Sequence, residues 1–332
     1  MGDTIKNHKK KNQVKNIVSI KNLSSREYFL YDNKERRQVL KNINLFMNKE
    51  ETWGIMGESA FEIKLLLEIM ANIRAYDTGR CILVERGMLR HKRIILKHVF
   101  YIGNSDMIYE NMNVLEFLVF AIIKFKADKV ELQEQIFEFL IDMGLGHISL
   151  TSNKMLTKEE KAVITLIAAA HSDSVMIVFN FPDYRFDEVL VDAIEKIADF
   201  MRKRGKCLII GTQNGHLIDK TCSHISVLAD GNIIYQGTVE NFCLSFDKVM
   251  VIIRDANIYS IMDKLIEIFP EYKISIKSDS LLINRLNEEI YDPLSIYKKI
   301  IEMGIVPDYM EINPKTVSNA YEEIIVEHDL QK

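Results

Sequence analysis

The sequence predicts an α/β protein built on a parallel sheet, followed by a smaller α+β domain. Near-continuous apolar runs at residues 52–56, 174–181 and 207–212 are typical of strands that are buried on both faces. Helical patterns separate these runs, and strands that alternate with helices favour a parallel sheet. Beyond Asp247 the pattern changes to β-α-β-β-α-β, which is the element order of a ferredoxin-like domain.

The first domain is expected to alternate short strands with helices. Apolar residues alternate between positions 43 and 47 as in an edge strand, and residues 52–56 then form a buried strand that leads into a loop at Gly57. A helix-rich insert at about 114–170 ends in a helix whose first turn, 157–160, has the composition of a capping box. The Asp230-Gly231 pair predicts a hairpin turn. The other expected elements are strands at 81–84, 96–103, 224–229 and 232–236, and helices at 64–75 and from about Asp187.

The second domain follows a change in element order. Its expected elements are strand 248–253, helix 257–269, strands 272–277 and 280–285, helix 293–303, strand 305–312 and a last helix at about 315–327. The sequence therefore predicts three parts. They are a basic disordered tail at 1–16, an α/β domain at 17–244 with a helical subdomain at about 105–170, and a ferredoxin-like domain at 247–330.

Composition excludes several classes of protein. The chain has 332 residues, of which 48% are hydrophobic, so it can bury a substantial core, and its net charge of −4 gives no overall footprint for nucleic acid. The most apolar stretch, 114–125, is too short to span a bilayer. The four cysteines form no C-x-x-C pair and the histidines have no metal-ligand spacing, so no metal site is expected. We expect a cytoplasmic protein with reduced thiols.

Residues 57–64 have the outline of a phosphate-binding loop, G-x-x-x-x-G-K-[ST], without the residues that bind phosphate. In a working loop, glycines let backbone N–H groups approach the phosphates, while the Lys and the hydroxyl serve the nucleotide and Mg²⁺. Here Glu62, Ile63 and Lys64 replace the second Gly, the Lys and the hydroxyl. The vestigial loop comprises Gly57, Glu58, Ser59, Ala60, Phe61, Glu62, Ile63 and Lys64.

Further landmarks follow this loop in a fixed order. After Asn104 and the helical insert come Leu-Thr-Lys-Glu-Glu at 156–160, a strand ending in Asn180-Phe181-Pro182, then Asp187, and a strand ending in Thr212-Gln213. The closing hairpin at 230–238 reads D-G-N-I-I-Y-Q-G-T. In this order the landmarks resemble those of the nucleotide-binding subunit of an ATP-binding-cassette (ABC) transporter, over about residues 17–244. The resemblance implies a P-loop NTPase-like sheet with a helical subdomain.

The part beyond Asp247 resembles the same superfamily less closely. Asn313-Pro314, followed by Tyr-Glu-Glu-Ile at 321–324, is similar to the C-terminal helix of exporters of the peptide-antibiotic resistance and immunity group. This resemblance would make the ferredoxin-like domain an appended module of such a subunit.

Each departure from the family pattern removes a chemical contribution to phosphoryl transfer, which depends on positioning and charge neutralisation. The resemblance implies that Asn180 replaces an Asp that holds Mg²⁺ and that Phe181 replaces a carboxylate that polarises the attacking water. Gln213 replaces a His that senses the γ-phosphate. Glu62 adds negative charge, and we expect it to fill the anion site at the start of the following helix. No catalytic residue is therefore expected. The degenerate positions are Asn104, Asn180, Phe181 and Gln213, and no cofactor is expected, with ATP and Mg²⁺ bound only if the degenerate site still accepts them.

The family's LSGGQ signature is also degenerate. Its place is taken by Leu156, Thr157, Lys158, Glu159 and Glu160, so the two glycines have become Lys and Glu. In the family this signature completes the site of a facing subunit, so a partner would meet a defective surface. We interpret the segment as a helix cap.

Two further sets of residues have alternative interpretations. Tyr28 lies where the family places an aromatic residue that stacks on adenine, although a half-buried strand position explains it equally well. Met107, Ile108, Tyr109 and Met112 are candidate contacts with a membrane permease, and core packing is the alternative.

Three hypotheses follow for the function. The first is a catalytically inactive ABC subunit, peripheral at the inner face of the membrane, that docks on an integral-membrane permease and pairs with itself or a paralogue. The second is a soluble pseudo-ATPase that acts as a regulatory or scaffold protein. The third is an unconventional but active ATPase. No nucleic-acid partner is expected.

Overall fold

The computed structural model describes most of the chain in two compact units. The described residues are 16–30, 36–88, 90–103, 107–123, 128–286 and 292–330. The first unit consists of the described parts of Met1–Gln213 and Lys220–Gln236, and the second of Asn214–Asp219 and the described parts of Gly237–Lys332. The boundary after Gln236 lies earlier than the expected 244–247, and a short piece of the first domain joins the second unit.

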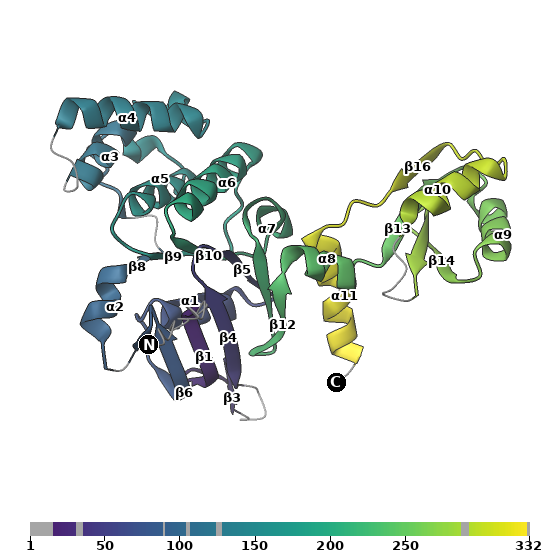
Figure 1. The fold of residues 1–332 in the computed structure, drawn as a ribbon, viewed down its shortest axis with the longest axis horizontal. Helices are drawn as coiled ribbons and strands as arrows, with labels where there is room; N and C mark the ends of the chain where they lie inside the picture. Colours follow the sequence, from purple (N-terminus) through teal and green to yellow (C-terminus); the bar gives the residue numbers. More distant parts are fainter. Residues whose placement is uncertain are drawn as a thin grey trace, which may run out of the picture. The chain divides into compact units, whose positions relative to one another are not determined.

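A six-stranded sheet forms the centre of the first unit, in the order β12-β11-β5-β10-β9-β8 (Figure 1). The contacts of β5 with β10 and β11, and of β9 with β8 and β10, are all parallel. Every residue of β5, β9 and β10 is buried, as the apolar runs predicted. The strands are β5 (Thr52–Gly57), β8 (Val99–Ile102), β9 (Met176–Asn180), β10 (Cys207–Gly211), β11 (His224–Ala229) and β12 (Asn232–Thr238).

An antiparallel sheet in the order β4-β1-β6-β7 shares a hydrophobic core with this parallel sheet. Ile20 and Leu45, from β1 and β4, belong to the same buried cluster as Trp53 and Ile55 of β5. The strands are β1 (Asn16–Ser25), β4 (Ile43–Asn48), β6 (Tyr76–Leu83) and β7 (Arg86–Gly87), with a separate ribbon of β2 (Tyr28–Leu30) and β3 (Arg36–Gln38). The expected strand at 81–84 is thus the end of a longer strand.

Helices of the first unit cover the sheet and build the insert. The insert helices α3 and α4 lie away from the parallel sheet, and α5 leads back to it (Figure 1). Asp187 is the N-cap of α6, as expected, whereas residues 96–98 are helical and not part of a strand. The helices are α1 (Ala60–Met70), α2 (Lys92–His98), α3 (Val114–Ile122), α4 (Lys129–Asp142), α5 (Lys158–Ala170) and α6 (Glu188–Lys203). None of the helices in the described ranges is long and apolar enough to cross a bilayer.

The second unit contains the ferredoxin-like domain. Its sheet has the antiparallel order β14-β15-β13-β16, and one face of it is covered by α9 and α10 through a core that includes Val251, Ile261 and Ile300. The strand β16 begins later than expected, because residues 305–308 have no strand partner. The elements are β13 (Val249–Arg254), α9 (Ile258–Ile268), β14 (Tyr272–Lys277), β15 (Ser280–Arg285), α10 (Pro293–Glu302) and β16 (Tyr309–Ile312).

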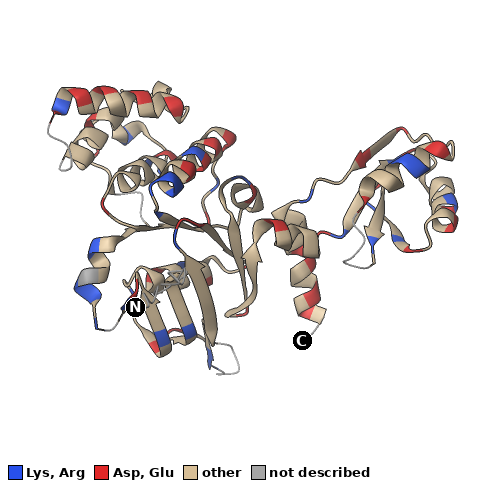
Figure 2. Ribbon diagram, in the orientation of Figure 1, with Lys and Arg blue, Asp and Glu red and all other residues tan. Residues whose placement is uncertain are grey.

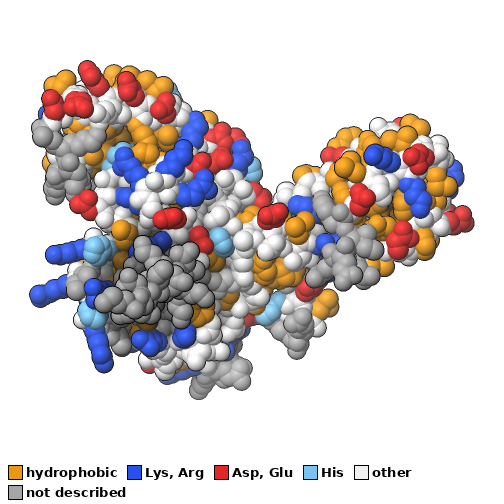
Figure 3. Space-filling view, viewed as in Figure 1, with side chains coloured by type: hydrophobic (Ala, Val, Ile, Leu, Met, Phe, Trp, Pro, Cys, Tyr) orange, Lys and Arg blue, Asp and Glu red, His pale blue; other side chains and the backbone are white. Residues whose placement is uncertain are grey.

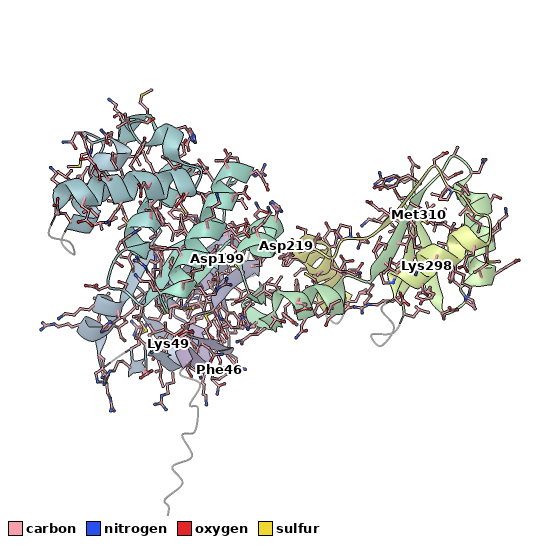
Figure 4. The ribbon with its side chains drawn as sticks, turned by 45° about the horizontal axis from the view of Figure 1, so that its top comes forward. Phe46, Lys49, Asp199, Asp219, Lys298 and Met310 are labelled. Carbon is pink, nitrogen blue, oxygen red and sulfur yellow. The ribbon has the colours of Figure 1, made fainter. Side chains whose placement is uncertain are left out.

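The last helix, α11 (Val317–Leu330), packs on α8 (Val239–Phe246). Its first N–H group, at Val317, donates hydrogen bonds of 3.0 and 3.2 Å to the Asp219 carboxylate in α7 (Gly215–Thr221). Asp219 is labelled in Figure 4. Because Asp219 lies in the segment 214–219, this contact helps to explain why that segment belongs to the second unit.

Candidate functional site: a closed strand-loop-helix turn

The turn after β5 is much shorter than a phosphate-binding loop. In that motif the helix follows the G-x-x-x-x-G-K-[ST] segment, whereas here α1 begins at Ala60, the fourth of the eight positions. Only Glu58 and Ser59 separate strand from helix, and the Ser59 hydroxyl caps the helix by accepting a hydrogen bond from the Glu62 N–H at 3.2 Å. The expected helix start at residue 64 is therefore wrong. Residues that would wrap around phosphate are helical instead.

Gly57 has a packing reason to be glycine. A Cβ atom at this position would lie 2.6 Å from the carbonyl oxygen of Leu228 in the neighbouring strand β11. The close approach of two parallel strands explains the residue without any ligand.

Glu62 is buried, but it does not occupy the anion site that the sequence suggested. Its carboxylate accepts a hydrogen bond of 3.2 Å from the Gly231 N–H in the β11–β12 turn, and Ser59 caps α1 in its place. Burial raises the pKa of Glu62, while the Gly231 hydrogen bond and the nearby Arg37 oppose that rise. Glu62 therefore holds the hairpin turn against α1.

The position of the motif Lys lies inside the core. The Ile63 side chain is 0% exposed and packs close to Gly211, where an added Cβ would lie 2.9 Å from Ile63 Cγ2. The adjacent Lys64 faces outward and pairs with Asp183, with Nζ 2.8 Å from Oδ1. Burial alone would raise the pKa of Asp183, but the hydrogen bond and charge of Lys64 lower it overall. Neither side chain is available to phosphate in this arrangement.

Asn180 ends β9 with its amide bound to protein groups. Its Nδ2 donates to the Lys64 carbonyl at 3.2 Å and to the Tyr101 hydroxyl at 3.0 Å. Burial raises the pKa of Tyr101, although this hydrogen bond from Asn180 opposes the rise. The Asn180 Oδ1 atom is buried and has no hydrogen-bond partner among the residues that the structure describes. A single neutral oxygen is a poor ligand for a hard cation such as Mg²⁺.

Phe181 belongs to an aromatic cluster. Its side chain is 2% exposed, with its ring centroid 5.0 Å from that of Phe179 and 4.5 Å from that of Tyr184. Tyr184 in turn lies under the ammonium group of Lys158, which is 4.8 Å from the ring centroid. An apolar cluster therefore replaces the carboxylate that would activate water.

Gln213 follows β10 and forms hydrogen bonds with the residues that follow β5 and β9. Its Nε2 donates to the backbone carbonyls of Glu58 at 2.6 Å and Gly57 at 3.3 Å, and its backbone N–H donates to the Pro182 carbonyl at 3.1 Å. The structure thus brings together the 57–64 turn, Asn180 and Gln213 at the carboxyl ends of β5, β9 and β10. This edge is where open α/β sheets bind ligands. Asn104 lies outside the described residues.

The degenerate signature is a helix cap, as expected. The Thr157 hydroxyl accepts from the Glu160 N–H at 3.1 Å, and the Glu160 carboxylate accepts from the Thr157 N–H at 2.7 Å. Leu156 is buried, and the Lys158 and Glu159 side chains form a 4.0 Å ion pair.

Sequence reasoning missed the role of the segment after Phe181. Asp183 and Tyr184 connect α1 to the start of α5 through Lys64 and Lys158, respectively. The only signal in the sequence was an acidic and an aromatic residue following Pro182. Their partners are distant in the chain, so the pairing could not be read from spacing.

Tyr28 is an exposed strand residue, with 48% of its surface accessible, and it pairs with Gln38 across the β2–β3 ribbon. Its neighbour Phe29 makes the contact with the vestigial loop, with its ring centroid 6.0 Å from that of Phe61. Adenine stacking by Tyr28 stays a prediction.

The candidate partner-binding residues separate into two groups. Met107 and Tyr109 are exposed and Met112 is half-buried, but Ile108 is 6% exposed and packs inside. An open groove of about 530 Å³ lies beside them on the helical insert. It is lined by Met112, Asn113, Leu115, Glu116, Val119, Phe120, Ile123, Lys129, Gln133 and Leu150. Figure 3 shows hydrophobic side chains gathered on the part of the insert formed by α3 and α4.

No model of a known protein family matches the chain. Among curated proteins it is similar to the methionine import ATP-binding protein MetN of Geobacillus kaustophilus, with 24% identity over 209 residues, which make up 60% of each chain. That match covers less than two thirds of the relative. It is also similar to the phosphonates import ATP-binding protein PhnC of Fusobacterium nucleatum, with 25% identity over 236 residues, 66% of this chain and 91% of that protein.

Two solved structures show the fold. An ATP-binding cassette solved as a dimer bound to ADP and Pi superimposes with a TM-score of 0.55 and 16% identity, over 67% of this chain and 98% of that one. The protein cbiO1 from Clostridium perfringens, part of an ABC transporter complex, gives a TM-score of 0.56 and 17% identity over 77% and 96% of the two chains. The chain thus has the fold of an ABC ATPase cassette and is similar in sequence to ABC transporter ATP-binding subunits. The resemblance of its C-terminal part to peptide-antibiotic exporters stays a prediction.

Proposed function

We propose that this chain, which has the ABC cassette fold, is an ATP-binding-type transporter subunit that has lost nucleotide chemistry and retains docking on a membrane permease. It would act at the inner face of the membrane, paired with a second cassette. Similarity to import ATP-binding proteins and to a cassette from a transporter complex supports the transport role.

The closed turn at residues 57–60 is the main support for the proposed loss of nucleotide binding. A phosphate cradle needs several unpaired N–H groups around an open concave loop. Here two residues connect β5 to α1, and the Gln213 amide binds the turn's carbonyl groups. Nucleotide binding would require the first turn of α1 to unwind.

Electrostatic repulsion also opposes nucleotide binding at this turn. A nucleotide brings negative charge, and Glu58 and Glu62 both lie at this turn. Two unit charges about 4 Å apart near a surface repel by roughly 4 kcal/mol at an effective dielectric of about 20. The neighbouring cation, Lys64, is already paired with Asp183. The residues present therefore do not fit ATP with Mg²⁺.

The insert groove supports the docking part. Phe120 is 49% exposed and Leu150 is 73% exposed at its rim, although both are large apolar side chains. Exposed apolar residues that gather in a concave site are typical of protein contacts. Glu116 and Lys129 in the lining offer one charge of each sign for orientation. A short amphipathic helix between two membrane spans of a permease is the occupant that we propose.

Two measurements test the loss of nucleotide chemistry. Turnover of ATP by the pure chain should equal the buffer control, and melting curves with and without millimolar Mg-ATP should overlay. A ligand at a hundredfold excess over its Kd would add about 2.7 kcal/mol of stability, which calorimetry would detect. A competent ABC subunit serves as the positive control. Turnover that is abolished by substitutions in residues 57–64 would contradict the proposal.

Docking is tested by affinity purification from solubilised membranes. An integral-membrane protein should co-purify with the wild type and be lost with the Phe120→Glu/Leu150→Glu variant. The control is Val189→Glu/Ile266→Glu, which places the same two charges at exposed apolar residues of α6 and α9, outside the groove. Retention of a soluble protein in place of a permease would favour the scaffold hypothesis.

A further inference from the structure

A second surface of the first unit is strongly basic. Between residues 76 and 98 there are six Lys or Arg residues and two acidic ones, whereas the whole chain has a net charge of −4. All six basic side chains are exposed. They are Arg80 in β6, Arg86 in β7, Arg90 in the following turn, and Lys92, Arg93 and Lys97 in α2, and we call them the basic face.

The fold gathers these charges on one side. The strands β6 and β7 pair with each other, and a shallow pocket of about 380 Å³ joins Arg80, Arg90 and His91 across the turn that follows. Lys and Arg are seen on α2 in Figure 2, and such side chains project on the α2 side of the molecule in Figure 3. The basic residues therefore come from two paired strands, the turn that follows them and the adjoining helix α2.

No ion pair within the described ranges neutralises the charges of the basic face. Among the described residues, no acidic side chain forms an ion pair with any of the six. Surface charges elsewhere are paired: Lys220, for example, lies 3.4 Å from Glu188 and 3.3 Å from Asp192. Of the two acidic residues in the same stretch, Glu85 is paired with Lys49 at 3.4 Å. Six cations that have no ion-pair partner in the described part of the chain produce a positive potential that attracts an extended anionic partner.

We propose that the basic face binds the acidic headgroups of an anionic lipid bilayer. Lys and Arg near such a surface each contribute to binding, and a patch of four to eight of them is enough for recognition. Leu96 is 50% exposed between the charges and adds an apolar side chain that can enter the headgroup region. Nucleic acid is the less suitable partner, because single strands are bound by stacking on aromatic residues and Tyr76, the only Phe, Tyr or Trp between 76 and 98, is buried.

This inference goes beyond permease docking and does not depend on it, since it concerns the chain alone on a lipid surface. The full chain is mixed with vesicles of phosphatidylcholine alone or with about 30% phosphatidylglycerol, and sedimentation gives the bound fraction. Binding should occur only with the anionic vesicles and should vanish at about 1 M salt, where the Debye length is about 3 Å.

The decisive variant is Arg90→Gln/Lys92→Gln/Arg93→Gln. Its partition onto anionic vesicles should fall at least about tenfold, because three charges near the surface are lost. The matched control, Arg185→Gln/Lys203→Gln/Lys273→Gln, changes the net charge equally at exposed sites off the basic face and should bind like the wild type. Circular dichroism checks that both variants are folded.

Three results would overturn the proposal. One is equal binding by the two triple variants, which would assign the effect to net charge or to the lysines of residues 1–15. Another is no binding of the wild type to anionic vesicles. The third is binding to duplex DNA or RNA that depends on Arg90, Lys92 and Arg93 without any binding to vesicles, since this would make nucleic acid the partner.

Discussion

The side-chain amide of Gln213 donates a 2.6 Å hydrogen bond to the backbone carbonyl of Glu58, and thereby joins the end of β10 to the turn after β5. A second bond from the same nitrogen, 3.3 Å long, reaches the Gly57 carbonyl. The family resemblance assigns this position to a His that senses phosphate. Here the side chain is bound to the turn itself, so its role in this structure is to hold the closed conformation.

Replacement of Gln213 by Ala should therefore destabilise the first unit. Gln213 is exposed, so loss of the hydrogen bonds from its side chain to two carbonyls should cost about 0.5 to 1.5 kcal/mol. Urea unfolding followed by the fluorescence of Trp53, the only tryptophan, reports on this unit because Trp53 lies in β5. Gln133→Ala, at an exposed position of α4, should stay within about 0.5 kcal/mol of the wild type. Equal midpoints for the two variants would show that the Gln213 contacts do not hold the turn.

Restoration of the motif lysine should harm the protein. The Ile63→Lys variant places an ammonium group where the side chain is 0% exposed, so we expect a loss of more than about 3 kcal/mol, or failure to fold. Lys64→Ala removes only a surface pair with Asp183, whose side chains are 40% and 52% exposed, and should cost less than about 1 kcal/mol. The measurement is again urea unfolding of both variants. A stable Ile63→Lys protein that binds ATP would show that the turn opens readily.

The pH dependence of stability should depend on Glu62. Its folded-state pKa is raised, with burial as the main cause, so the protonated form is favoured in the folded state. The stability that Glu62 contributes is then fully present below the unfolded pKa, about 4.3, and is lost as pH rises through the folded pKa. Glu62→Gln keeps an acceptor for the Gly231 N–H without the charge. It should melt above the wild type at pH 7, with the difference shrinking as pH falls toward 4.5. A lower melting temperature at pH 7 would mean that attraction to Arg37 outweighs burial.

Local patterns predicted much of the fold. The apolar runs at 174–181 and 207–212 became the buried strands β9 and β10, and the capping box at Thr157 formed with both of its hydrogen bonds. The β-α-β-β-α-β order was enough to predict a ferredoxin-like sheet, because that order has few compact solutions. These features depend on neighbouring residues, so sequence spacing contains the information.

The closed turn was not predicted because it depends on distant contacts. Glu62 meets Gly231, 169 positions away, and Gln213 meets Glu58, 155 positions away. The motif comparison showed which chemical groups were missing, but not that α1 would extend to Ala60. That extension requires the Ser59 cap and the burial of Ile63 together. The contact of α11 with α8 was missed for the same reason.

A buried carboxylate organises the second unit. Asp247 is 1% exposed and accepts hydrogen bonds of 3.0 and 3.2 Å from Asn313 Nδ2 and 3.2 Å from Asn319 Nδ2. The Lys315 ammonium lies 3.6 Å from the same carboxylate and donates to the Asp247 carbonyl at 2.6 Å. These partners lie in the segment between β16 and α11 and in the first turn of α11, so Asp247 fixes the last helix to the end of α8.

Removal of the cation from this cluster should be costly. Lys315→Met leaves the buried Asp247 without its opposite charge, for which we expect a loss of about 3 to 5 kcal/mol. The Asp247→Asn/Lys315→Met double variant should recover part of that loss, because the buried carboxylate is then neutral as well and no longer needs the Lys315 ammonium. Lys277→Met is the control, since its pair with Glu322 is 3.9 Å long and both side chains are 74% exposed; it should change stability by less than about 0.5 kcal/mol. Calorimetry on the full chain measures all three. If Lys315→Met melted like the control, the hydrogen bonds of Asn313 and Asn319 alone would be sufficient to hold the buried carboxylate.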